Sequence, residues 1–125
     1  MQYCETDGGR ILKSFKDDCV IRSMSIVLEE TYGKVFEELM QLGLEMGAFP
    51  SHEKVWIKYI ESKGFVKNKP PRDINGKLVK LRNWDFEGVA VVRNSGHLTA
   101  VSKGCVFDSW DCRARPVNSY WTKAE

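Results

Sequence analysis

The chain has few cysteines, few histidines and no long apolar run. Its four cysteines include no C-x-x-C pair, which argues against a zinc ribbon and against a thioredoxin-like redox motif. No stretch approaches the ~18–20 apolar residues that a transmembrane helix needs. The N-terminus has neither the basic flank nor the apolar stretch of a signal peptide. These absences predict a cytoplasmic protein with no membrane association.

Length and composition favour one globular domain. The chain has 125 residues, of which 42% are hydrophobic and 29% are charged, so it can bury one core. The sequence contains no internal repeat and no low-complexity segment. We therefore expect a single domain spanning residues 1–125.

The cysteines themselves suggest no structural cofactor. In a cytosol Cys4, Cys19, Cys105 and Cys112 would be mostly reduced, so a disulfide is the less favoured alternative. A metal site built from His97, Cys105 and Cys112 is disfavoured too, because strand alternation points the two cysteines to opposite sides. We expect no metal and no other cofactor.

Apolar periodicity predicts three helices in the first half of the chain. The first spans residues 19–28, the second residues 32–46, and the third begins after a Ser51 cap and ends at Gly64. Asp18 is the expected cap of the first helix, with its carboxylate accepting from a backbone N–H two or three residues on. Thr31 is the expected cap of the second helix.

The second half of the chain reads as strands. Residues 67–80 predict an irregular connection, since they contain two consecutive prolines and an Asn-Gly pair. Short β-branched runs then predict strands at residues 89–92, 97–102, 105–110 and 117–121. Helices followed by strands predict an α+β fold with N-terminal helices packed on a C-terminal antiparallel β-sheet.

The turn at Lys103-Gly104 sets the pairing of the strands at residues 97–102 and 105–110. With a two-residue loop, Val101 lies opposite Val106, and alternate residues of both strands share one face. His97 and Asp108 then become diagonal neighbours, about 5–8 Å apart at the backbone. The register therefore selects Asp108, rather than Asp111, as the partner of His97.

Three residues form a candidate catalytic site. Cys19 stands at the start of the first predicted helix, where the helix dipole favours a thiolate. His97 can hold the proton, and Asp108 can orient its imidazole. Backbone N–H groups at the helix start can stabilise an oxyanion. Asp17 and Asp18 oppose the thiolate, because nearby carboxylates raise a thiol pKa.

Other polar and aromatic residues have simpler interpretations. His52 lies near a helix start, and we expect it at the surface. Trp110, Tyr120 and Trp121 either line a substrate groove or pack in the core, and core packing is favoured.

Charge is unevenly distributed along the chain. Residues 1–61 contain 7 basic and 11 acidic residues, a net charge of −4, whereas residues 63–82 contain 7 basic residues and one aspartate, a net charge of +6. The basic segment would suit nucleic acid or an acidic protein. A solvated loop is favoured, and nucleic-acid binding ranks last, because residues 67–82 contain no interleaved aromatic residue.

The chain resembles the papain-like cysteine peptidase superfamily, closest to bacteriocin-processing domains of the double-glycine type. The matching residues are Asp18-Cys19 opening a helix, Gly96-His97 opening a strand, and Asp108 on the next strand. The resemblance covers roughly residues 11–122. Residues 18–22, 96–101, 108–111 and 120–121 also look like those of small uncharacterised bacteriophage proteins.

The resemblance implies a papain-like minimal fold and attack by the Cys19 thiol on an amide or thioester carbonyl. Peptide hydrolysis, deamidation and acyl transfer all fit, with a protein or peptide as substrate. Papain-like enzymes usually have a glutamine as oxyanion donor six residues before the nucleophile, where this chain has Lys13. The alternative is a non-catalytic, phage-type binding module that keeps the fold and captures a host protein in the host cytoplasm.

Overall fold

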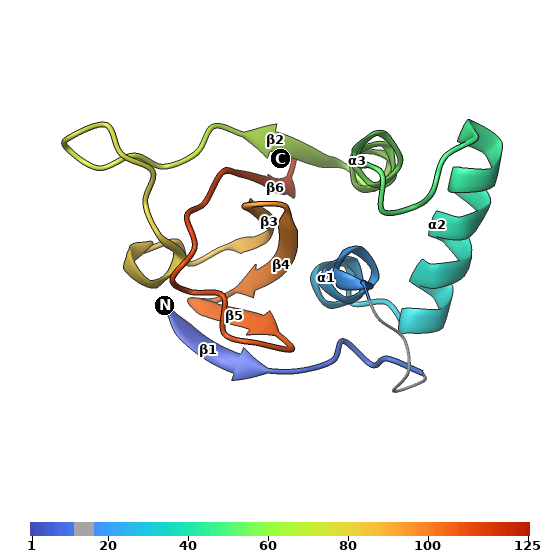
Figure 1. Ribbon diagram of the computed structural model, residues 1–125, viewed down its shortest axis with the longest axis horizontal. Helices are drawn as coiled ribbons and strands as arrows, with labels where there is room; N and C mark the ends of the chain where they lie inside the picture. Colours follow the sequence, from blue (N-terminus) through green and yellow to red (C-terminus); the bar gives the residue numbers. More distant parts are fainter. Residues whose placement is uncertain (12–16) are drawn as a thin grey trace.

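The computed structural model consists of three helices packed against one face of a six-stranded sheet (Figure 1). It describes residues 1–11 and 17–125. The elements, in chain order, are β1 (Gln2–Glu5), α1 (Cys19–Leu28), α2 (Tyr32–Met46), α3 (Glu53–Ser62), β2 (Phe65–Asn68), the 3-10 turn η1 (Leu81–Asn83), β3 (Val89–Asn94), β4 (His97–Ser102), β5 (Cys105–Asp108) and β6 (Ser119–Lys123). The predicted α+β class is confirmed. No helix in these described ranges has the length and apolar character needed to cross a membrane.

The sheet is mixed, whereas the sequence predicts an antiparallel one. Its strand order is β1-β5-β4-β3-β6-β2, and the pairing of β1 with β5 is parallel while the other pairs are antiparallel. The two edge strands, β1 and β2, were not predicted. Each has four residues and mostly exposed or half-exposed side chains, so neither shows a strong apolar alternation. Both edge strands pair with strands that lie far away in the sequence.

Apolar side chains fill both faces of the sheet. The core on the helical face joins α1, α2 and α3 to the sheet and includes Met24, Val35, Leu39, Val55, Trp56, Ile60, Val91, Ala100 and Trp121. The core on the opposite face includes Leu81, Trp84, Val92, Val101, Val106, Cys112 and Val117. Trp121 is fully buried and Tyr120 packs against the second core, so the prediction of core packing is correct for these two residues.

The β4–β5 hairpin has the predicted register. Lys103 and Gly104 have φ values of 50° and 78°, as a two-residue hairpin turn requires, and glycine adopts this conformation without strain. Val101 pairs with Val106, and both belong to the core on the non-helical face. The second strand ends at Asp108, two residues earlier than predicted.

The start of α3 differs from the prediction. The cap is His52 rather than Ser51, and its Nδ1 accepts a hydrogen bond from the backbone N–H of Lys54 at 3.2 Å. His52 is exposed, as expected. The predicted Thr31 cap of α2 is confirmed, because its hydroxyl accepts from the N–H of Lys34 at 3.2 Å.

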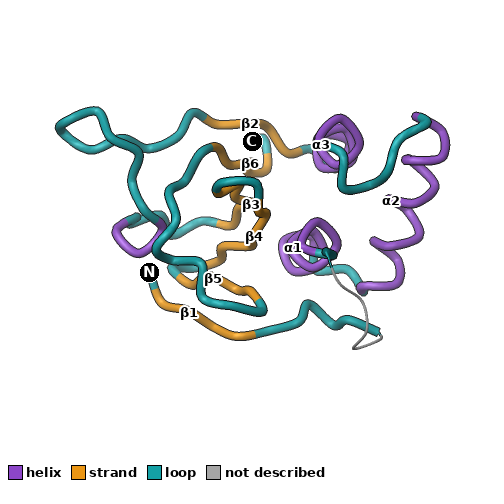
Figure 2. Tube along the Cα trace, viewed as in Figure 1, coloured by secondary structure: helices purple, strands orange, loops and turns teal. Residues whose placement is uncertain are grey.

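The segment between β2 and β3 is a long loop that extends away from the helices (Figure 2). The predicted irregular connection over 67–80 is partly wrong, because β2 continues to Asn68 and a bridge joins Arg72 to Leu78. Asp73 closes the turn between them by accepting hydrogen bonds from the N–H groups of Asn75 and Lys77. Most of the basic residues of the segment are therefore presented by an ordered loop.

Candidate functional site

Cys19 is the first residue of α1, and its side chain is half-buried. Burial raises the pKa of its thiol. Two effects lower the pKa by more than this: hydrogen bonding to His97 and to the backbone of Leu98, and the charges of His97 and Arg22. The pKa of Cys19 is therefore below its ordinary value. The start of a helix adds to the effect, since its unpaired N–H groups favour a negative charge.

His97 begins β4 and connects the thiol to a buried carboxylate. Its Nε2 donates to Oδ2 of Asp108 at 2.7 Å. Burial lowers the pKa of His97, but hydrogen bonds with Asp108, Cys112 and Cys19 raise it, to about 11. The predicted pairing of His97 with Asp108 is confirmed, and Asp111 instead forms an exposed ion pair with Arg113.

Asp108 is held by several donors besides the imidazole. Its Oδ1 accepts from the backbone N–H of Ser109 at 2.7 Å and lies 3.4 Å from Nη2 of Arg22. The Sγ of Cys112 lies 3.6 Å from Oδ2. Burial raises the pKa of Asp108, but hydrogen bonds from His97 and Thr99 lower it by more. The carboxylate is therefore ionised and fixed in orientation.

Asp18 does not cap α1 in the predicted way. Its side chain makes no capping hydrogen bond. Instead it accepts two hydrogen bonds from Arg10, at 2.8 and 2.9 Å, one from the hydroxyl of Tyr32 at 2.8 Å, and a short contact from Arg22. The Asp18 carboxylate binds these partners rather than a backbone N–H of α1 because it is 3% exposed, and a buried carboxylate needs charged partners. They also offset the negative charge that would oppose a thiolate at Cys19.

Arg22 connects the two buried carboxylates. It lies one turn after Cys19 on α1, contacts Asp18 through Nη1 and Asp108 through Nη2, and is 7% exposed. Sequence reasoning missed this residue. The ion pair of Arg22 with Asp18 could have been predicted, because the two residues have the i, i+4 spacing of a helical ion pair. The contact of Arg22 with Asp108 could not, because Asp108 lies 86 residues further along the chain.

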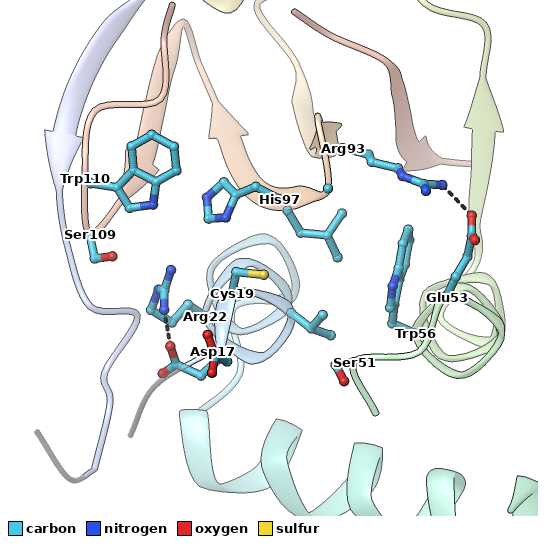
Figure 3. Close-up of a pocket in the computed structure, with 14 residues that line it drawn as sticks. Asp17, Cys19, Arg22, Ser51, Glu53, Trp56, Arg93, His97, Ser109 and Trp110 are labelled. Atoms are coloured by element: carbon cyan, nitrogen blue, oxygen red, sulfur yellow. Dashed lines mark hydrogen bonds and ion pairs between the residues drawn. The ribbon is translucent and has the colours of Figure 1, made fainter. Parts of the chain in front are cut away.

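A cleft of about 560 Å³ opens over the thiol and the imidazole. Figure 3 shows Cys19 and His97 between Trp110 on one side and Trp56 on the other. The ring of Trp110 packs on the ring of His97 with centroids 4.8 Å apart. The guanidinium carbon Cζ of Arg115 lies over Trp110, 4.8 Å from the ring centroid. Trp110 is thus a lining residue rather than a core residue, and it shields one side of the imidazole from water.

The far wall of the cleft comes from α3 and β3. Ser51, Glu53 and Trp56 contribute from the helical side, and Arg93 forms an ion pair with Glu53. Glu53 and Arg93 could not be identified from the sequence, since 40 residues separate them and neither belongs to a motif. Lys13, the residue at the expected oxyanion position, lies outside the described residues.

One group of side chains has the donor types of a metal site. His97, Asp108 and Cys112 place three ligand atoms within 4.8 Å of one another, without Cys105. However, both oxygens of Asp108 already accept hydrogen bonds, and the guanidinium of Arg22 lies 3.4 Å from one of them. A cation there would meet a buried positive charge, so the group suits an imidazole–carboxylate pair better. All four cysteines, each within the described ranges, are free thiols.

The raised pKa of His97 predicts a pH-dependent stability. A group whose pKa is about 11 in the folded protein and ~6.5 in the unfolded chain stabilises the fold fully below pH ~6.5, and this stabilisation is lost as the pH rises toward 11. We expect the unfolding free energy of Cys19→Ala to fall across this window relative to that of Cys19→Ala/His97→Gln. Urea unfolding of both variants at several pH values measures this difference, and parallel curves would contradict it. The shared Cys19→Ala change removes the thiol, whose lowered pKa acts with the opposite sign.

Comparisons of the chain with protein-family models, with curated proteins and with solved structures found no significant match.

Proposed function

We propose that this protein is a thiol hydrolase of the papain-like type that acts on an amide or thioester bond. Cys19 is the nucleophile, His97 the general base and later the general acid, and Asp108 the orienting residue. The observation that carries the proposal is the position of His97, which hydrogen-bonds Asp108 through Nε2 at 2.7 Å and interacts with the Cys19 thiol at the start of α1. A nucleophile that interacts with a base, when that base is held by an acidic orienting group, is the signature of covalent catalysis.

The proposed reaction has two steps. The Cys19 thiolate attacks the carbonyl carbon, and the resulting oxyanion is stabilised by backbone N–H groups at the start of α1. The imidazolium of His97 then gives its proton to the leaving amine or thiol, so the carbonyl–nitrogen or carbonyl–sulfur bond breaks and an acyl-cysteine remains. His97 next takes a proton from water, whose oxygen attacks the acyl carbon, and the acid and the free thiol are released. A different acceptor in place of water would give acyl transfer.

The architecture supports this proposal. The helix that begins with Cys19 packs directly against β4, the strand that begins with His97. The backbones of α1 and β4 therefore fix the positions of the Cys19 thiol and the His97 imidazole, since both groups are carried on short side chains. A cleft of about 560 Å³ above them leaves room for a substrate chain. Peptidase, deamidase and acyl-transferase activity all use this geometry.

The test is the rate of Cys19 alkylation by iodoacetamide as a function of pH. A Cys4→Ser/Cys105→Ser background removes the more exposed thiols and keeps Cys112, which is 1% exposed and contacts Asp108. Peptide mass mapping assigns the alkylated residue. We expect an apparent pKa below the ~8.5 of a free thiol, returning to or above that value in His97→Gln.

The chain offers a matched control for the histidine. His52 is exposed and caps α3, so His52→Gln should leave the alkylation profile unchanged. An apparent pKa at or above 8.5 in the parent protein would sink the hydrolase proposal. It would favour instead a binding module that keeps the fold without the chemistry.

A further inference from the structure

A second hollow adjoins the cleft and shares one residue with it. This hollow has a volume of about 440 Å³ and lies between β2, the residues that follow it, and the segment leading into β6. Arg93 of β3 lines both the cleft and the hollow. In Figure 3, Arg93 reaches along the edge of the cleft to its ion-pair partner Glu53. A chain bound over the thiol can thus continue past Arg93 into the hollow.

The hollow is basic. Three cationic side chains line it, those of Lys67, Lys69 and Arg93, and within the described part of the chain its lining includes no acidic residue. Asn118 and Ser119 add hydrogen-bonding groups. The ammonium of Lys67 lies 5.9 Å from the ring centroid of Trp121, which restricts the direction of that side chain.

The segment that supplies both lysines is itself basic. Residues 67–70 line the hollow and belong to the segment 63–82, whose net charge is +6 in a chain with a net charge of only +2. A concave surface lined by one sign of charge concentrates ligands of the opposite sign. Glu53 offsets Arg93 alone, so the two lysines set the sign of the potential inside the hollow.

We propose that this hollow binds an acidic segment, rich in Asp or Glu, of a polypeptide whose scissile or acyl-donating bond lies over Cys19. The inference rests on the proposed function for the class of substrate. A polypeptide fits better than a nucleic acid for two reasons. The hollow joins a cleft whose thiol suits acyl chemistry, and within the described residues no aromatic side chain lines the hollow for base stacking.

Binding is measured on the Cys19→Ala variant of the 125-residue chain, so that no chemistry is needed. Three fluorescein-labelled decapeptides serve as probes: one rich in Asp and Glu, its Asn and Gln counterpart, and a Lys-rich peptide. A single-stranded decanucleotide is the fourth probe, and fluorescence anisotropy gives each Kd. We expect the acidic peptide to bind at least about tenfold more tightly than its amide counterpart at 50 mM salt, and this preference to shrink at 500 mM.

Charge reversal locates the binding site. Lys67→Glu/Lys69→Glu should remove the preference for the acidic peptide. The matched control is Lys58→Glu/Lys77→Glu, which makes the same change in net charge at exposed positions outside the hollow and should keep most of the preference. Equal loss in both double variants would overturn the proposal, as would equal binding of the acidic and amide peptides.

Tighter binding of the decanucleotide than of the acidic peptide would also overturn it, in favour of a nucleic-acid groove. These outcomes are separate from the test of the hydrolase. A reactive Cys19 without acidic-peptide binding removes only this inference. Acidic-peptide binding beside an inert thiol removes the catalytic proposal and the placement of a reacting bond over Cys19, and leaves the hollow as a site for an acidic polypeptide.

Discussion

Replacing Cys19 with alanine is expected to abolish turnover of peptide thioesters and amides. The Sγ of Cys19 is the nucleophile of the first step and carries the acyl group in the proposed reaction, so a loss of at least about 10³-fold in kcat/KM follows. The fold should survive, because Cys19 is half-buried and the change removes one sulfur atom. Hydrolysis of a fluorogenic peptide thioester series measures the first effect, and thermal unfolding measures the second.

The matched control is Cys105→Ala. Cys105 is also a half-buried free thiol, and it lies in the hairpin that contains His97 and Asp108. It does not line the cleft, so its removal should leave kcat/KM within a factor of about two. Turnover that persists in Cys19→Ala while the same activity is lost in Cys105→Ala would assign the chemistry to a different thiol.

The site could be predicted from the sequence where local rules determine the geometry. Lys103-Gly104 is a two-residue turn between alternating strands, and such a turn fixes the register of a hairpin. That register brings His97 and Asp108 to one face, and in the structure His97 Nε2 lies 2.7 Å from Asp108 Oδ2. Cys19 was placed at a helix start by the apolar stripe that follows it, and α1 does begin there.

Prediction failed where distant partners decide the outcome. Asp18 has the sequence signature of a capping residue, yet its carboxylate accepts hydrogen bonds from Arg10, Tyr32 and Arg22 instead of capping α1. Charged and phenolic donors around a buried carboxylate outweigh a neutral backbone N–H, and only tertiary structure brings them together. The same reason explains β1, because its parallel pairing with β5 spans about a hundred residues.

The basic segment shows a different limit. The positive charge of the segment could be read from the sequence. The sequence did not show which of its lysines line a hollow. Lys67 and Lys69 line the same hollow as Arg93. Only β6 separates β2 from β3 in the sheet, and no local pattern encodes this strand order. The composition therefore indicated a basic segment, and only the fold shows which of its lysines line a hollow.

Replacing Arg22 with methionine is expected to destabilise the fold by about 3 kcal/mol. Removing one partner of a buried ion pair costs ~3–5 kcal/mol, since it leaves a charge buried without compensation. The lower end applies here, because Asp18 keeps Arg10 and Tyr32, and Asp108 keeps His97 and the N–H of Ser109. Urea unfolding at pH 7 gives the difference directly.

Arg93→Met is the comparison that isolates burial. Arg93 also pairs with a carboxylate, but the side chains of Arg93 and Glu53 are 36% and 51% exposed, against 9% and 3% for Arg22 and Asp18. Exposed pairs contribute ~0–1 kcal/mol, so the two arginine variants should differ by at least about 2 kcal/mol. Equal effects would mean that Arg22 does not bridge the two carboxylates in solution. A large loss for Arg22→Met alone would identify this arginine as the residue that fixes the helix carrying Cys19 to the strand carrying Asp108.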